Sequence, residues 1–423
     1  MSVEQAASDF AQAFPMRSEL ISRMHSRHLF FRMGLINLAI VALLGVALRY
    51  KILFELPFID YRNLLSAHSH FAFVGWVSLM VLTLLVHHLL PSEHAVRKKF
   101  RILLFAVNLC GYGMLASFPF QGYGAISIFF SSAFIVVTYV FAFAYLPAIK
   151  VLHRNVRLLA TCALVSLLLS AAGPILLGYI KATGSTNSVL YRDAIYSFLH
   201  LQYNGFFSLA LCAHFLHRMG GHRAPRFARI FSISLCASVV PTLFLSLFWH
   251  NQVLLYYIAA LGVLFLVIAL FSFLRIWRQP GSLLGFRQPL ARRLIRLSFL
   301  CFCLKLLLQS CTLVPRLANA VYGDRPVIIG FLHLVFLGFV SLYLLAVLVE
   351  EGYFTRAHGM PAYPVYIFVS AVFTNEALLM LQGLGILLGT YSRIFNWGLL
   401  VAAILLFTGA GTMAAFALRR KLR

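Results

Sequence analysis

Charged residues and cysteine motifs are scarce in this chain. Only 11% of its 423 residues are charged, with 11 acidic side chains in all. The seven cysteines form neither a CxxC pair nor a CxxCH motif, which excludes the common thiolate metal sites and covalently attached haem. Cys301-Phe-Cys303 comes closest to a metal motif, and we expect it to serve packing in a membrane. Residues 1–28 are polar and lack an apolar run, so we expect no cleavable signal peptide.

Apolar residues, in contrast, make up most of the sequence. They account for 61% of it, and the mean hydropathy is +0.89. This composition indicates an all-α polytopic membrane protein, with the lipid bilayer as its surroundings. The net charge of +24 arises from basic loops, and no basic cluster alternates with stacking aromatics in a polar segment. We therefore expect no nucleic-acid partner.

Apolar runs long enough to span a bilayer predict twelve transmembrane helices. They lie near residues 29–49, 63–90, 100–120, 124–147, 156–180, 193–216, 227–249, 252–274, 294–314, 326–349, 364–388 and 394–418. The links at Gln121-Gly122 and at His250-Asn251 are so short that they predict tight hairpins. Most Lys and Arg fall in the two termini and in the even-numbered loops, which predicts that both termini are cytoplasmic in a cell (inner) membrane.

One ten-residue pattern occurs three times. It reads His70-Phe-Ala-Phe73-Val-Gly75-Trp76-Val-Ser78-Leu79, and it returns at His200–Leu209 and His333–Leu342. The histidines are 130 and 133 residues apart, which indicates an internal triplication. The prediction is a cytoplasmic segment, residues 1–28, followed by three four-helix units with pseudo-threefold symmetry: residues 29–150, 151–280 and 281–423, the last with a basic C-terminus.

The three histidines are the candidate ligands. Each lies about seven residues, or roughly 10 Å, from the outer end of its helix. Three imidazoles at one depth favour a metal or haem site inside the bundle. The alternative is that the pattern serves helix packing, with Gly75, Gly205 and Gly338 permitting close approach and the serines bonding across helices.

Four further residues are candidates for this site or for a function near it. His68 points about 200° away from His70 around the helix, so the two cannot bind one metal together. His250, at the outer end of its helix, is a candidate to join His200. Lys305 and Glu376 lie in the same four-helix unit at similar depth, and they predict either a buried ion pair or a proton path.

Histidines at the inner ends of two helices are expected to be interfacial and structural. They are His87, His88, His214, His217 and His222.

Twelve helices and histidines on helices 2, 6 and 10 resemble the catalytic subunit of haem–copper oxidases and nitric-oxide reductases. Ala67-His68-Ser-His70-Phe-Ala-Phe-Val-Gly75-Trp76 is similar to the HxH segments of that superfamily and of the NnrS family, whose members are linked to haem, copper and nitric-oxide stress. Phe248-Trp249-His250-Asn251 resembles the copper-binding end of oxidase helix 7.

This resemblance implies a set of roles. His70 and His333 would be the axial ligands of a low-spin haem, and His68 a further ligand or a group that supports one. His200 and His250 would stand where the second metal, copper, is held. The chain departs from the oxidases in having a single histidine on helix 10, Asn251 after His250, and HxH on helix 2. The expectation is therefore a haem protein with an altered second site.

Three functions follow as hypotheses. The first is electron transfer or oxygen or nitric-oxide chemistry, with a cytochrome or other respiratory subunit as electron donor. The second is a non-enzymatic transporter or metal-handling protein in which Lys305 and Glu376 couple protons. The third is a structural subunit of a respiratory complex.

Overall fold

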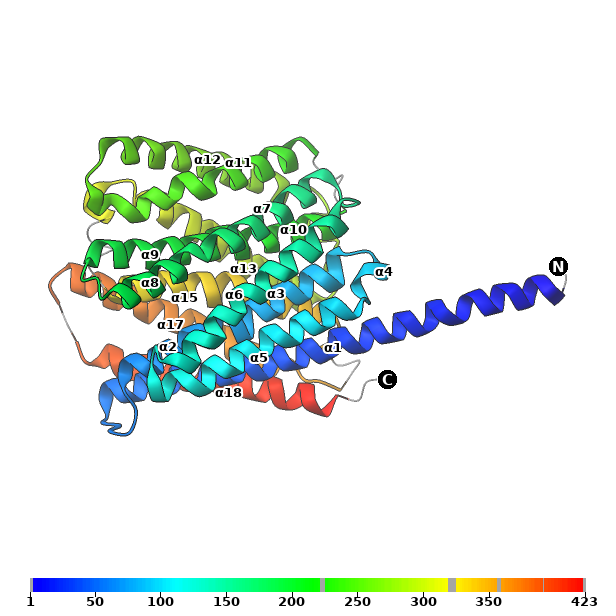
Figure 1. Cartoon of the computed structure of the whole chain (residues 1–423), viewed down its shortest axis with the longest axis horizontal. Coiled ribbons are helices and arrows are strands. Elements are labelled where there is room, and N and C mark those ends of the chain that lie inside the picture. The colour runs from blue at the N-terminus through cyan, green and yellow to red at the C-terminus, as the bar shows by residue number, and fades with distance from the viewer. Residues whose placement is uncertain (1–2, 221–224, 319–324, 356–358, 391, 421–423) are drawn as a thin grey trace.

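The computed structural model describes residues 3–220, 225–318, 325–355, 359–390 and 392–420. All regular secondary structure in these ranges is helical. The helices run side by side along one axis, with α11 and α12 at one edge of the bundle and α18 at the opposite edge (Figure 1). Eleven of the described helices are long and apolar enough to cross a membrane. The chain is thus an all-α, multi-pass membrane protein in its architecture.

These eleven helices coincide with eleven of the predicted spans. They comprise α1 (Val3–Leu53, apolar from Ser26), α2 to η2 (Tyr61–Leu89), α5 (Lys98–Gln121), α6 with η3 (Ala125–Ile149), α7 and α8 (Arg154–Thr183), α11 with η5 (Pro225–His250), α12 (Val253–Trp277), α13 (Pro289–Cys311), α15 to α16 (Arg325–Glu350), α17 (Tyr363–Leu387) and α18 (Ile394–Arg419). A short helix, α4 (Ser92–Ala95), lies between α2–η2 and α5.

The remaining predicted span, residues 193–216, falls on another continuous helical run. It consists of α9 (Ser188–His200), η4 (Leu201–Phe207) and α10 (Ser208–Arg218). This run carries Gln202 and Asn204 among its buried residues, and it is not among the eleven apolar helices. The total of twelve spans stays a prediction.

Both predicted hairpins are present. Gly122 ends α5 with φ +55°, and a Cβ there would lie 2.5 Å from Asn63 Oδ1, so glycine suits this turn. Asn251, also with positive φ (54°), turns the chain from η5 (Phe244–His250) into α12. Asparagine tolerates the left-handed conformation better than most residues. Two adjacent antiparallel helices follow from each turn.

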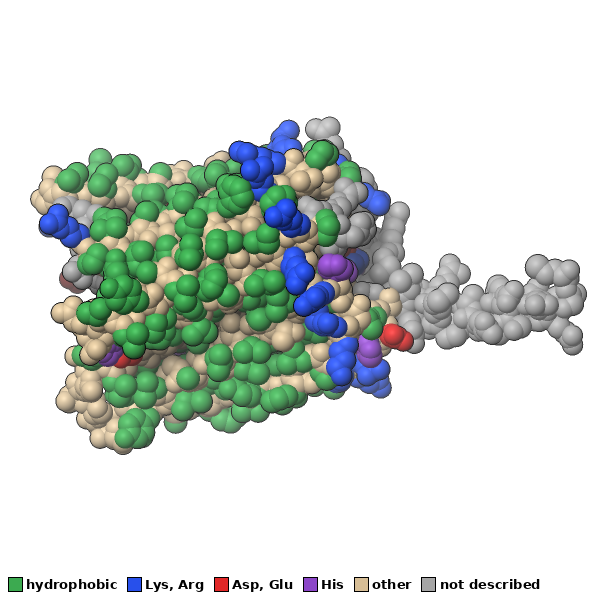
Figure 2. Space-filling model, turned by 90° about the horizontal axis from the view of Figure 1, so that it is seen from above, with side chains coloured by type: hydrophobic (Ala, Val, Ile, Leu, Met, Phe, Trp, Pro, Cys, Tyr) green, Lys and Arg blue, Asp and Glu red, His purple; other side chains and the backbone are tan. Residues whose placement is uncertain are grey.

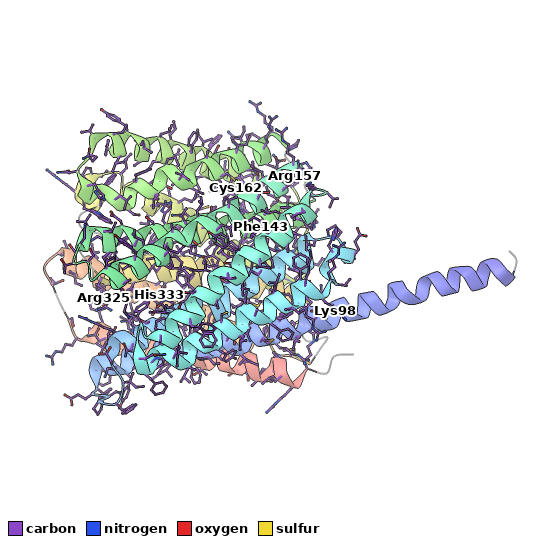
Figure 3. The ribbon with its side chains drawn as sticks, viewed as in Figure 1. Lys98, Phe143, Arg157, Cys162, Arg325 and His333 are labelled. Carbon is purple, nitrogen blue, oxygen red and sulfur yellow. The ribbon has the colours of Figure 1, made fainter. Side chains whose placement is uncertain are left out.

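The surface fits a bilayer. Figure 2 shows an apolar surface with Lys and Arg gathered towards one end. We call this the basic end; α5, α7 and α11 begin there, and Figure 3 places Lys98 and Arg157 there. Figure 3 places Arg325 and His333 at the opposite end, which we call the distal end. The helix α1 begins and α18 ends at the basic end (Figure 1).

Candidate functional site

Each repeated histidine is followed by a segment of π-helix. These segments are η1 (Ala72–Ser78), η4 (Leu201–Phe207) and η6 (Leu334–Ser341). A π-helix is rare, and π-helical turns are frequently found at functional sites. The sequence repeat is therefore also a repeat of backbone conformation.

The three π-helical segments meet in the interior. One ring from each forms a cluster, with centroid distances of 5.9 Å for Phe73–Phe207, 5.7 Å for Phe207–Phe336 and 4.6 Å for Phe73–Phe336. Tertiary packing therefore joins three segments that lie far apart in the sequence. Each repeated histidine therefore directly precedes a segment that contributes a ring to this shared apolar cluster.

The repeated glycines and serines pack helices together. A Cβ on Gly205 would lie 2.3 Å from Ser166 Cβ on α7, and a Cβ on Gly338 would lie 2.9 Å from Cys301 Sγ on α13. Trp76 Nε1 donates to Ser341 Oγ at 2.9 Å, which joins the first repeat to the third. These glycines and serines therefore lie at contacts between helices, as the packing alternative predicts.

His68 and His70 leave their helix in different directions. Nδ1 of His68 donates to the carbonyl of Val41 on α1, at 3.1 Å. Nδ1 of His70 donates to the carbonyl of Ser66 at 2.9 Å, and its ring packs 4.3 Å from that of Phe118 on α5. The two imidazoles therefore contact different helices, as their spacing along the helix predicts.

His333 lies near His68. Its Nδ1 donates to the carbonyl of Ile329, one turn earlier, at 2.8 Å. Its ring is close enough to His68 to interact with it electrostatically, and Arg49 lies within the same range of both. His333 thus lies within electrostatic range of His68, and its pairing with His70, implied by the resemblance, stays a prediction.

These hydrogen bonds fix where each imidazole keeps its lone pair. A carbonyl oxygen only accepts, so Nδ1 of His68, His70 and His333 carries the proton. In the neutral ring the lone pair is then on Nε2. A histidine that binds a metal normally has this arrangement, with its other nitrogen donating to a carbonyl or carboxylate. All three residues are therefore in the tautomer that ligation through Nε2 requires.

His200 differs from the other two repeat histidines. Its Nε2 donates to the carbonyl of Val239 at 2.7 Å, and its Nδ1 accepts a bond from Asn204 at 3.0 Å. The side chain is buried, and both ring nitrogens have protein partners. Binding a metal would require His200 to give up one of these bonds.

His250 is not brought to His200. Its Nε2 is 2.8 Å from Asp193 Oδ2, and Trp249 Nε1 donates to Asp193 Oδ1, also at 2.8 Å. Asp193 precedes His200 by seven residues on α9, or about 10 Å along the axis. In the described part of the chain, no three His, Cys, Asp or Glu side chains are grouped so as to hold a metal ion.

Lys305 and Glu376 are likewise not joined in an ion pair within the described ranges. Lys305 Nζ donates to Ser208 Oγ at 3.2 Å and lies 5.8 Å from the ring centroid of Tyr203. Glu376 accepts a bond from Asn375 at 3.2 Å. The thiol of Cys301, one turn before Lys305 on α13, is the group in electrostatic range of Glu376. The two charged groups thus contact different neighbours.

A polar chain at the basic end was not predicted. Tyr343 OH lies 2.7 Å from His214 Nδ1, His214 Nε2 lies 3.0 Å from His88 Nδ1, and His88 Nε2 lies 3.5 Å from Glu351 Oε1. We call these four residues the inner chain. His214 is completely buried, whereas it was expected at the interface; His222, grouped with it in that prediction, lies outside the described residues.

An ion pair closes the carboxylate end of the inner chain. Arg27 Nη2 lies 2.8 Å from Glu351 Oε2, so the carboxylate is paired as an acceptor. Tyr343 and His214, and His214 and His88, are within hydrogen-bond distance of each other, whereas His88 Nε2 and Glu351 Oε1, at 3.5 Å, are in range of an ion pair but form no hydrogen bond. Burial raises the pKa of Glu351, while the Arg27 and Arg218 guanidinium groups oppose this shift.

Glu350 secures the same end of the bundle. Its carboxylate accepts backbone N–H bonds from Arg287 and Gln288 just before α13, and it lies 3.7 Å from Arg218 Nη2. The signal in the sequence was the adjacent pair Glu350-Glu351, since acidic residues are rare in this chain.

No known protein-family model matches the chain, and no curated protein matches it.

Proposed function

We propose that this protein binds haem inside a bundle of twelve transmembrane helices and acts in respiratory electron transfer or in oxygen or nitric-oxide chemistry. The bundle would consist of three four-helix units about a pseudo-threefold axis. The repeated π-helical segments support this arrangement, and the ring contacts of Phe73, Phe207 and Phe336 join the three units. The helical run of α9, η4 and α10 would be the twelfth span.

The tautomers of His68, His70 and His333 carry the haem proposal. Each has Nδ1 anchored on a backbone carbonyl, which directs the lone pair to Nε2. Because His68 and His333 lie on two helices within electrostatic range of each other, they are the pair that we propose would bind one iron. His70 is the remaining candidate, and pairing it with His333 is the arrangement implied by the oxidase resemblance.

The protein's part in the chemistry would be to bind and orient the group. Haem iron supplies reversible one-electron transfer and, with an open coordination position, the binding of diatomic gases. The carbonyls of Val41 and Ile329 would fix the planes of the two imidazoles and raise their basicity. Arg49 would provide a positive charge beside the His68–His333 pair, where a carboxylate could accept its hydrogen bonds.

A second metal is less well supported. A copper ion at His200 would displace either Val239 or Asn204 as a hydrogen-bond partner, and His250 is occupied by Asp193. The proposal is therefore limited to haem. The electron donor would be a cytochrome or another respiratory subunit, and the protein would lie in the cell membrane with both termini cytoplasmic.

The test is a reduced-minus-oxidised visible spectrum of the purified full chain, with haem quantified per chain. Wild type should show sharp α and Soret bands at one haem or more per chain. His333→Ala and His68→Ala should abolish or shift the bands, and the matched control His250→Ala should leave them unchanged. If His70→Ala removes the bands while His68→Ala does not, the axial pair is His70 with His333. A colourless wild type, expressed with ample haem, would overturn the proposal.

Helix packing supports a second candidate function, a transporter or a structural subunit. Two observations favour it. Neighbouring side chains occupy the space where a Cβ would lie on Gly205 and Gly338, and buried Lys305 donates to Ser208. Proteoliposomes distinguish the two. A transporter predicts substrate-dependent proton flux that Lys305→Met or Glu376→Gln removes, and a structural subunit predicts no flux but co-purification with cytochromes.

A further inference from the structure

A groove opens on the lipid-facing surface at the basic end, between α7 and α11. It encloses about 300 Å³ and is lined by Arg154, Arg157 and Arg229, together with Leu158, Thr161 and Ile233. We call it the α7–α11 groove. Figure 3 shows Arg157 at this end of the bundle, and Figure 2 shows that basic side chains form a row at the same end.

The charge in this groove is not balanced by the protein. All three arginines are exposed, and no Asp or Glu pairs with them within the part of the chain that the structure describes. Arg157 Nη1 donates to the carbonyl of Lys150 at 2.8 Å, which uses one of its five N–H groups. The groove therefore presents many free donors to an anion.

The backbone adds to this field. Both α7 and α11 begin at this end, at Arg154 and Pro225, so the positive ends of two helix dipoles point at the same region. The lower wall is apolar: Ile233 is 47% exposed and lies one turn further into the bilayer than Arg229. A ligand that matches this groove has an anionic oxygen group next to the arginines and a hydrocarbon part next to Ile233, deeper in the bilayer.

We propose that the α7–α11 groove binds the headgroup of an anionic phospholipid. The three guanidinium groups would hold the phosphate oxygens, because guanidinium matches phosphate geometry with paired hydrogen bonds. The acyl chains would lie along Leu158 and Ile233. Basic pockets between transmembrane helices at the membrane surface recognise lipid headgroups in this way. This inference does not depend on the haem proposal.

Native mass spectrometry of the full chain in detergent tests the proposal. Phosphatidylglycerol and phosphatidylcholine of equal chain length are added in parallel, and wild type should retain the anionic lipid preferentially. The variant Arg154→Gln/Arg157→Gln/Arg229→Gln should lose about 100-fold in its affinity for phosphatidylglycerol, since each arginine near the surface contributes about 1 kcal/mol and 1.4 kcal/mol is tenfold.

The matched control is Lys98→Gln/Lys99→Gln/Arg101→Gln, which removes the same charge from exposed positions of α5 at the same end. It should keep the lipid preference. A variant with Lys at positions 154, 157 and 229 should bind at intermediate strength, because Lys keeps the charge but not the paired donors.

Three results would overturn the proposal. One is equal retention of phosphatidylglycerol by wild type and the groove variant. Another is equal loss in the α5 control, which would mean that only the general basic surface matters. The third is displacement of the lipid by millimolar inorganic phosphate, which would assign the groove to the free anion. Size-exclusion profiles and melting temperatures verify that each variant is folded.

Discussion

Tyr343 and His214 are 129 positions apart in the sequence, and their side chains meet at 2.7 Å with both buried. The contact joins α10 to α16 (Leu342–Glu350) and begins the inner chain that ends at Glu351. Because neither group reaches water, each depends on the other for its hydrogen bond. This relationship leads to the first prediction.

Tyr343→Phe should destabilise the protein by about 1–3 kcal/mol, because it leaves Nδ1 of buried His214 without its hydrogen-bond partner. The measurement is unfolding in a chemical denaturant in detergent. Tyr257→Phe is the matched control, since Tyr257 is 66% exposed. Equal stability of Tyr343→Phe and wild type would show that the contact contributes nothing.

The stability of the basic end should depend on pH through Glu351. Burial raises the pKa of this carboxyl above its ordinary value of 4.5, so the folded state binds its proton more tightly than the unfolded state does. The contribution is fully present below pH 4.5 and is lost as pH rises through the folded-state pKa. Glu351→Gln should remove this part of the pH dependence.

The measurement is the free energy of unfolding as a function of pH for wild type and Glu351→Gln. Glu93→Gln is the control, because Glu93 is an exposed glutamate at the same end. If the Glu351→Gln and wild-type curves run parallel across the acidic range, the folded protein does not hold this proton more tightly.

Gly205→Ala should be destabilising by about 1–3 kcal/mol, because the new Cβ would lie 2.3 Å from Ser166 Cβ and force the helices apart. Gly178→Ala is the control. A Cβ at Gly178 has nothing within 4 Å, so alanine there should stabilise α8 by about 0.5–1 kcal/mol. The double variant Ser166→Gly/Gly205→Ala should recover part of the loss, and no recovery would argue against a direct clash.

An external ligand offers a further prediction for the haem proposal. His333→Gly should lose its haem bands, and free imidazole in the buffer should restore them, because the added ring can occupy the space of the missing side chain. The same experiment on His200→Gly should show no such rescue, since both nitrogens of His200 bond to the protein. Absorbance at the Soret maximum provides the measurement.

The local properties of this protein follow from its sequence. Length and continuity of apolar residues predict the helices, because lipid offers the backbone no hydrogen bonds and a helix satisfies its own. The residues of the two short links likewise predict the hairpins at Gly122 and Asn251. The spacing of His68 and His70 predicts that they diverge, since it depends only on the helical angle per residue.

Partners across the bundle were decided by tertiary packing alone. Nothing in the spacing of the repeat indicates that His333 lies within electrostatic range of His68, or that His250 pairs with Asp193. The separation of Lys305 from Glu376 and the inner chain from Tyr343 to Glu351 arise in the same way. Periodicity fixes the face of a helix on which a residue lies. The rotation and depth at which two helices meet are set by the fit of all their side chains together.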